Sequence, residues 1–331
     1  MKKITLFILY VISINLFLSC CTNSTDQNND NQYTLVSLKG PSSMAILPFI
    51  DSISQQTKYN RQHSKDENLD ITICTEPLQV RKMMLDGSAD FAVLPMTTAA
   101  LLYNKDIGYQ LIAVPIWGTL YLCGTADYNI KDWKDLKDKN VYLMAKGMTP
   151  DVLFRYLISE NGLTPYEDVN LDYRFPTHID LANAVLAGRA DLAVLSEPYL
   201  SLAMLKNPNL KRFFDLGDKW TELKGIPIAE TALLCKKEVI ENDPEFVENL
   251  IKIYSQSTDW VNNNIDKAAS LAVIYNIIDD SIAAGNSIPF SNLKVRKAKD
   301  VKDFIKQYLN VFYEMDPQII GGKMPDEEFY Q

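Results

Sequence analysis

The residues best suited to hold a small molecule are glycines and hydroxyl residues that follow strand-like runs. Gly40 and Gly147 allow the backbone to turn tightly, while Ser42, Ser43 and Thr149 stand where a hydroxyl can cap a helix or donate to a solute. Free N–H groups at helix starts favour negative or strongly accepting ligand atoms by about 0.3–1 kcal/mol per helix. We expect a binding site at these turns, with capping alone as the alternative for each hydroxyl.

Further polar candidates follow two short apolar runs. Thr97 and Thr98 offer hydroxyls, and Glu197 offers a carboxylate that would prefer a ligand N–H or ammonium group, because a buried carboxylate without a partner is costly. Glu230 points the same way, unless it is a solvated rim charge. Trp117 could stack on a planar ring or simply pack at a hinge. The full candidate set is Gly40, Pro41, Ser42, Ser43, Met44, Pro95, Met96, Thr97, Thr98, Trp117, Gly118, Gly147, Met148, Thr149, Glu197 and Glu230.

Catalytic and metal chemistry find little support. The sequence contains no G-x-S-x-G, Walker A, G-x-G-x-x-G or H-E-x-x-H motif, and its histidines are His63 and His178 only. Cys74, Cys123 and Cys235 lie far apart, so we expect no metal site and no cofactor. Binding without turnover is the prediction.

Composition indicates a folded, acidic chain. Its 331 residues are 47% hydrophobic and 23% charged, and at about 150 residues per domain they suggest two compact units. The net charge is −9 and basic residues form no long stripe, so nucleic acid is an unexpected partner.

The N-terminus has the pattern of an export signal. Lys2 and Lys3 precede a mostly apolar run at residues 4–18 that is shorter than the about 20 residues of a membrane span. The run ends at Ser19-Cys20-Cys21, which resembles a bacterial lipobox with Cys20, or alternatively Cys21, as the acylated residue. We expect a signal peptide at residues 1–19 and a flexible tether at residues 20–32 that anchors the protein to a bacterial membrane, on the periplasmic or cell-surface side.

A repeated pattern sets the expected architecture. Residues 87–94 (GSADFAVL) recur as residues 188–195 (GRADLAVL), with six of eight positions identical, and residues 39–42 (KGPS) resemble residues 146–149 (KGMT). Each copy alternates strand and helix, which predicts an α/β protein with a parallel, doubly wound sheet per copy. The first copy includes a helix over residues 43–55. After residue 220 one more strand, at residues 228–234, is followed by helices at residues 243–262, 266–275 and 300–313.

Two such units with a helical C-terminal extension resemble a bilobal, type II periplasmic binding protein. The likeness is strongest to ABC-transporter substrate-binding proteins of the nitrate, sulfonate, taurine and pyrimidine-precursor branch, through residues 38–44, 87–95, 111–125, 147–151, 187–198 and 319–330. It implies a first lobe of residues 33–117 plus 226–331, a second lobe of residues 118–225, and crossovers near residues 117–119 and 225–227.

The resemblance also implies a function. A small solute would bridge Ser42, Ser43 and Thr97 on one lobe to Thr149 and Glu197 on the other, close the hinge, and pass to a permease and ATPase. We expect a monomer whose solute is a nitrogen heterocycle or a sulfonate or carboxylate. The alternatives are an enzyme like the pyrimidine-precursor synthases, which share this fold, and a surface-display or adhesion lipoprotein.

Overall fold

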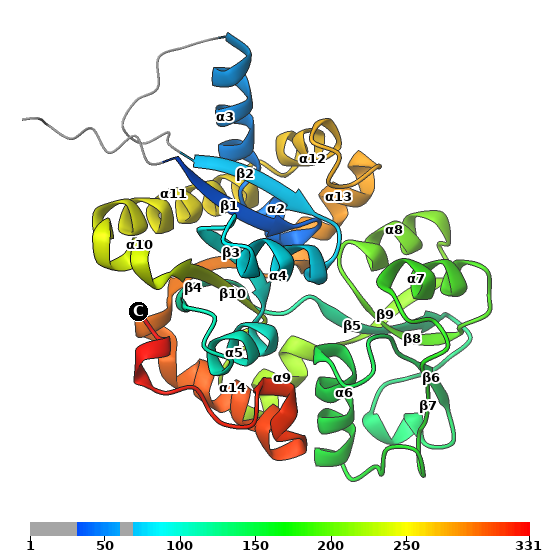
Figure 1. Cartoon of the computed structure of the whole chain (residues 1–331). Coiled ribbons are helices and arrows are strands. Elements are labelled where there is room, and N and C mark those ends of the chain that lie inside the picture. The colour runs from blue at the N-terminus through cyan, green and yellow to red at the C-terminus, as the bar shows by residue number, and fades with distance from the viewer. Residues whose placement is uncertain (1–31, 60–68) are drawn as a thin grey trace, which may run out of the picture. The chain divides into compact units, whose positions relative to one another are not determined.

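The structure is a computed structural model that describes residues 32–59 and 69–331 (Figure 1). The expected signal peptide, Cys20, Cys21 and nearly all of the tether lie outside these residues. Residues 33–331 form one compact unit.

Two mixed β-sheets organise this unit. The first sheet has the strand order β11-β4-β10-β3-β1-β2, and the second has the order β7-β6-β8-β5-β9. The strands of the first sheet are β1 (Tyr33–Leu38), β2 (Leu69–Cys74), β3 (Phe91–Pro95), β4 (Tyr109–Ile116), β10 (Thr231–Lys236) and β11 (Leu293–Lys297). Those of the second are β5 (Leu120–Thr125), β6 (Asn140–Tyr142), β7 (Asn170–Asp172), β8 (Leu192–Ser196) and β9 (Leu210–Asp215).

The repeat predicted from the sequence is visible in the strand pairing. β1 pairs in parallel with β2 and β3, just as β6 pairs in parallel with β7 and β8. The expectation of purely parallel sheets is wrong, however, because β10 runs antiparallel to β3 and β5 runs antiparallel to β8. Each of these strands arrives from the other sheet along the chain and therefore enters its new sheet from the opposite end.

Helices follow most of the strands, and helices dominate the C-terminal region as predicted. Asp243 starts the longest of them, since its side chain accepts a hydrogen bond from the Phe246 N–H and Pro244 occupies the first helical position. The α-helices are α2 (Pro41–Met44), α3 (Leu47–Tyr59), α4 (Pro77–Leu85), α5 (Met96–Asn104), α6 (Thr149–Glu160), α7 (His178–Leu186), α8 (Tyr199–Lys206), α9 (Leu216–Lys224), α10 (Lys237–Asn242), α11 (Pro244–Asn263), α12 (Ile265–Ile274), α13 (Ser281–Ser287) and α14 (Lys302–Met315). Short 3-10 turns are η1 (Trp133–Leu136), η2 (Ile288–Phe290), η3 (Ala298–Val301), η4 (Pro317–Ile320) and η5 (Glu327–Phe329).

The single helix expected over residues 43–55 is two helices. α2 ends at Met44 and α3 begins at Leu47. Pro48 accounts for the break, because proline has no N–H to donate and its ring clashes with the carbonyl four residues earlier. A four-residue α2 cannot supply the helix N-terminus that we expected to face a solute.

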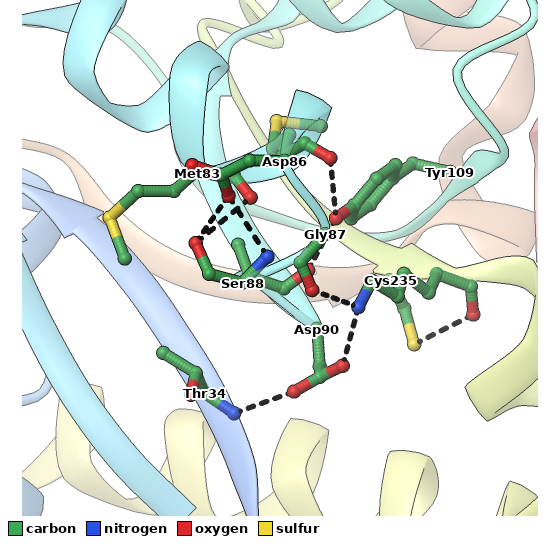
Figure 2. Close-up of polar contacts among 11 residues, drawn as sticks. Thr34, Met83, Asp86, Gly87, Ser88, Asp90, Tyr109 and Cys235 are labelled. Carbon is green, nitrogen blue, oxygen red and sulfur yellow. Dashed lines mark hydrogen bonds and ion pairs between the residues drawn. The ribbon is translucent and has the colours of Figure 1, made fainter.

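The repeated Gly-x-Ala-Asp turn links neighbouring strands of its sheet through hydrogen bonds. Before β3, the Asp90 carboxylate accepts from the Thr34 N–H (2.9 Å) and from the Lys236 ammonium (2.9 Å), which ties together three strands of the first sheet (Figure 2). The Asp90 carbonyl accepts from the Lys236 N–H, and the Asp191 carbonyl in the second copy accepts from the Thr125 N–H. In each copy the motif therefore bonds to the antiparallel strand that enters its sheet.

The two sheets share a hydrophobic core. One buried cluster contains Leu94 of β3, Leu122 of β5, Phe154 of α6 and Phe312 of α14. The chain passes from the first sheet to the second through residues 117–119 and returns through residues 225–230. Within residues 32–59 and 69–331, no helix combines the length and apolar character needed to cross a bilayer.

Candidate functional site

Four polar side chains from distant parts of the sequence meet where the two sheets adjoin. They are Thr97 in the first turn of α5, Thr149 at the start of α6, Glu230 just before β10, and Tyr308 in the middle of α14. The Thr97 and Thr149 hydroxyls are 3.2 Å apart, so the α5 turn of the first sheet touches the α6 turn of the second. We call these four residues the inter-sheet cluster.

Tyr308 carries a hydroxyl that is not matched by the protein around it. The side chain is completely buried, and its hydroxyl lies near both Thr149 and the Glu230 carboxylate. It makes no hydrogen bond of normal geometry to a described residue, and neither does the hydroxyl of Thr231, which is 8% exposed. Burial raises the pKa of Tyr308, so its hydroxyl keeps its proton and is available as a donor. Unpartnered buried hydroxyls are costly, which marks this place as one suited to polar ligand atoms.

Glu230 joins the two crossovers. The Thr119 N–H donates to one oxygen of its carboxylate and the Thr119 hydroxyl to the other, both over 2.6 Å. The Glu230 N–H donates to the Ile116 carbonyl, and the Glu230 carbonyl accepts from the Met96 N–H at the start of α5. This residue is therefore a fixed part of the crossover region and, being only partly accessible, is not the solvated rim charge that was the alternative expectation.

Burial, helped by nearby Asp215 and opposed by the two hydrogen bonds from Thr119, raises the pKa of Glu230 from 4.5 to about 7. Asp215 caps α9 by accepting from the Gly217 and Asp218 N–H groups. Burial also raises the pKa of Asp215. Two carboxyl groups thus lie beside the crossovers, and Glu230 stays protonated up to a higher pH than an exposed glutamate does.

This arrangement predicts a pH-dependent stability. Between pH 4.5 and about 7 the folded protein holds a proton on Glu230 that the unfolded chain releases, so the contribution of this group to stability falls as the pH rises. In E230Q, which keeps an acceptor for Thr119, the free energy of unfolding relative to the unmodified protein should rise by up to about 2–3 kcal/mol between pH 5 and pH 8. Urea unfolding at both pH values measures it. E241Q, on the exposed surface of α10, is the control, and equal pH profiles for E230Q and the unmodified protein would contradict the prediction.

The first predicted turn lies against the second sheet. Gly40 adopts a φ of 107°, and a Cβ atom at this position would be 3.6 Å from Pro198 Cδ in the loop after β8. Ser43 donates to the Leu38 carbonyl (2.6 Å), and the Ser42 carbonyl accepts from the buried Tyr254 hydroxyl (3.0 Å). The turn is therefore fixed by hydrogen bonds to Leu38 and Tyr254 while it lies against the loop after β8.

The second predicted turn is internally bonded. The Gly147 N–H donates to Asp151 (2.7 Å), whose carboxylate also accepts from two nitrogens of Arg155 and from the Tyr173 hydroxyl. Asp151 therefore joins the turn to Arg155 and Tyr173. Because this N–H is already used, Thr149 is the part of the turn that remains suited to a ligand.

Glu197 is already paired with a cation. It forms an ion pair with Arg212, and its second oxygen accepts from the Ser201 N–H (3.1 Å). Burial raises the pKa of Glu197, while Arg212 acts in the opposite direction. The Arg212 guanidinium also lies 3.9 Å from the centre of the Phe290 ring. A ligand ammonium would have to compete with Arg212 for this carboxylate.

A second polar group lies at the end of β8. The Ser196 hydroxyl is 2.7 Å from His178 Nδ1, and the imidazole stacks on the Tyr199 ring at 5.4 Å between centres. Burial lowers the pKa of His178 to about 4, so the ring is neutral at physiological pH. Glu76, after β2 of the first sheet, is close enough to raise the pKa of Tyr199. The charge of Glu76 therefore acts across from the first sheet on a residue that follows β8 of the second sheet.

Trp117 and Gly118 are held by the C-terminal region. The Trp117 indole N–H donates to the Lys294 carbonyl (2.6 Å), and the Asn292 amide donates to the Gly118 carbonyl (2.8 Å). Gly118 has a φ of 129°, which is strained for any other residue. This geometry favours hinge packing over ring stacking for Trp117.

The remaining candidates divide by exposure. Met44 and Met96 are fully buried in the core, and Thr98 is buried as well. Met148 is 45% exposed. Pro41 and Pro95 begin or precede helices. None of these six residues has a polar side-chain contact that identifies a ligand.

Some residues of the site gave no usable signal in the sequence. Tyr308 lies in an amphipathic helix where an aromatic residue is ordinary, and Thr119, Asp215 and Arg212 follow no motif. Only their position in space makes them part of the site. Glu230 was identified by its charge and its place at the returning strand.

Two surface hollows lie elsewhere. One of about 570 Å³ runs beside α14 and the C-terminal tail, between Lys224, Asn310 and Met324, and one of about 650 Å³ lies beside Asp127 and Asp191. Neither includes a predicted site residue. The contact between Thr97 and Thr149 closes the space between the turns, so the site consists of buried polar side chains rather than an open hollow.

Known proteins resemble this chain in sequence and fold. The sequence profile of a family described as ABC transporter, phosphonate, periplasmic substrate-binding protein matches residues 38–236. YtlA of Bacillus subtilis is 21% identical over 266 residues, which are 69% of this chain and 79% of that protein. An ABC transporter protein from Parabacteroides distasonis superposes with a TM-score of 0.78 and 26% identity, over 91% of this chain and 99% of that one. The periplasmic aliphatic sulphonate-binding protein SsuA of Escherichia coli superposes with a TM-score of 0.70 and 15% identity, over 91% and 95% of the two chains.

Proposed function

We propose, because the chain belongs to the phosphonate-binding family of ABC-transporter periplasmic substrate-binding proteins, that it captures one small organic solute at the inter-sheet cluster and delivers it for import. Proteins of this family are exported and bind small molecules rather than transform them, and their partners are the permease and ATPase of the transporter. Membership therefore excludes the alternative of a pyrimidine-precursor synthase-like enzyme.

The proposed mechanism is hinge closure. The moving units are the lobes at residues 33–117 plus 226–331 and at residues 118–225, with residues 117–119 and 225–227 as the hinge. The contact between Thr97 and Thr149 carries this proposal, because it joins a helix start of one sheet to a helix start of the other. A solute that bonds to both hydroxyls binds the closed form better than the open form, and only this difference can shift the equilibrium toward closure.

The proposal includes attachment to a membrane. A lipid on Cys20, or alternatively on Cys21, would hold a monomeric protein beside its permease through the tether. The solute would be a nitrogen heterocycle or a sulfonate or carboxylate. The hydroxyl groups and the backbone of the turns suit either class of solute, because these protein groups can both accept and donate hydrogen bonds.

A pair of threonine substitutions tests the site. In the T97V/T149V variant both hydroxyls are lost while the side-chain shape is kept, so the affinity for the solute should fall at least ten-fold with little loss of stability. Glu197 is left intact because its ion pair with Arg212 would confuse binding with folding. The solute would be identified by mass spectrometry of the native protein and its binding measured by calorimetry.

The matched control is T72V in β2, a half-buried threonine away from the cluster. An unchanged affinity for the solute in T97V/T149V would contradict the assignment of the binding site to the inter-sheet cluster. If no small molecule co-purifies and none of a broad panel raises the melting temperature, the surface-display alternative would replace solute capture.

A further inference from the structure

Charge pairing separates Glu230 from three other enclosed carboxylates, although its neighbour Asp215 likewise has no ion pair with a described residue. Asp90 faces Lys236, Asp151 faces Arg155, and Glu197 faces Arg212. In each case a basic side chain balances the carboxylate over a short distance. Glu230 has no ion-pair partner among the described residues, although a buried carboxylate without a cation is strongly disfavoured.

The surroundings of Glu230 do not offer a positive charge. The crossover contributes the neutral Thr119, the start of α9 contributes the acidic Asp215, and α14 contributes the Tyr308 hydroxyl. At the start of α5, the Met96 N–H is already bonded to the Glu230 carbonyl. No lysine, arginine or histidine of the described chain is among the groups that act on this carboxylate.

The carboxylate still has room to accept hydrogen bonds. Two oxygens offer about four lone-pair sites, and Thr119 occupies two of them. The Tyr308 hydroxyl is completely buried and makes no hydrogen bond of normal geometry to a described residue, although it lies near Thr149 and within electrostatic range of the same carboxylate. An acceptor and a donor are thus both incompletely used at one place.

We propose that the solute supplies the missing cation, as a protonated amine or a cationic nitrogen heterocycle whose N–H groups donate to Glu230. The hydroxyls of Tyr308, Thr97 and Thr149 bind its remaining polar atoms. This inference rests on the proposed function and narrows its solute class. An anion that carries no nitrogen would bring a second negative charge to Glu230 and be repelled, whereas a zwitterion could keep its acidic end away from Glu230.

Two pairs of probes that differ only in the ammonium group test the inference. They are 2-aminoethylphosphonate against ethylphosphonate and taurine against ethanesulfonate, with 4-aminopyridine as a cation that has no acidic group. Calorimetry at pH 8 should show at least ten-fold tighter binding of one amino compound than of its nitrogen-free partner, or binding of 4-aminopyridine. In E230Q this preference should be lost, while E241Q should retain it.

The outcomes distinguish this inference from solute capture itself. Equal binding of the nitrogen-free acids, or an unchanged preference in E230Q, would overturn the cationic ligand and leave solute capture standing. If no probe binds, mass spectrometry of a co-purifying solute decides, because a basic nitrogen supports the inference and its absence overturns it. If no probe binds and no solute co-purifies, the proposed function fails together with this inference.

Discussion

Replacement of Glu197 by alanine is expected to lower the free energy of unfolding by about 3–5 kcal/mol, because it leaves a buried cation without its partner. The Glu197 carboxylate is inaccessible, and Arg212 lies in a largely enclosed position. Arg212 also bonds to the Ser201 hydroxyl (2.9 Å), but its Nε already lacks a partner among the described residues. Urea unfolding followed by circular dichroism measures the loss.

Two variants make the cause of this loss identifiable. E222A removes half of an exposed ion pair with Lys219 and should cost no more than about 1 kcal/mol. The double variant E197L/R212L removes both buried charges and should recover most of the stability that E197A loses. If E197A cost no more than E222A, the pair would not be the structural element that we describe.

Replacement of Trp220 by alanine should be similarly damaging, at about 3–5 kcal/mol, because it opens a large cavity in the shared core. Trp220 is completely buried in α9 and packs edge-on against Tyr308, with 5.6 Å between ring centres. Tyr156 packs on it at 5.8 Å. The variant therefore also removes the support of the Tyr308 ring.

A phenylalanine at position 220 separates cavity from hydrogen bonding. The indole N–H of Trp220 has no partner among the described residues, so W220F loses no hydrogen bond and should cost only about 1–2 kcal/mol. L223A, at a 39% exposed residue of the same helix, should change stability by less than about 0.5 kcal/mol. A W220F variant as unstable as W220A would show that the indole N–H has a bonding role.

The ion pair at Glu197 changes how the site should be studied. A Glu197 variant that fails to bind solute could fail because the loop after β8 is disturbed, since the Glu197 N–H also donates to the Thr119 carbonyl at the crossover. The inter-sheet cluster avoids this difficulty. Its hydroxyls can be removed without leaving a charge unpaired.

Much of the architecture was predictable because the positions of its strands, helices and turns depend on local sequence patterns. Apolar strand-like runs, Pro244 at a helix start and the repeated Gly-x-Ala-Asp turn each depend on residues close together in sequence. The antiparallel entry of β5 and β10 was not predictable in this way, because it depends on the path of the chain between the sheets. A strand carries no local mark of the direction of its neighbour.

The candidate site shows the same division. Gly40, Thr97, Thr149 and Glu230 were selected from residue type and position, and the structure places Thr97 in contact with Thr149 and Glu230 near Tyr308. The sequence could not show which charged side chain has an ion-pair partner, because Glu197 and Glu230 are equally plausible ligand carboxylates in the sequence. Only one of them has a cation beside it in the folded protein.

The sequence by itself determined the order of strands and helices, the repeat, and the turns at which polar residues gather, because short-range periodicity and the special backbone of glycine and proline act within a few residues. The tertiary structure alone decided which carboxylate is neutralised and which hydroxyls stay unpartnered. Those properties depend on contacts between residues as far apart as 97, 149, 230 and 308, which no local pattern encodes. Burial and pairing, rather than residue type, set the charge of the site.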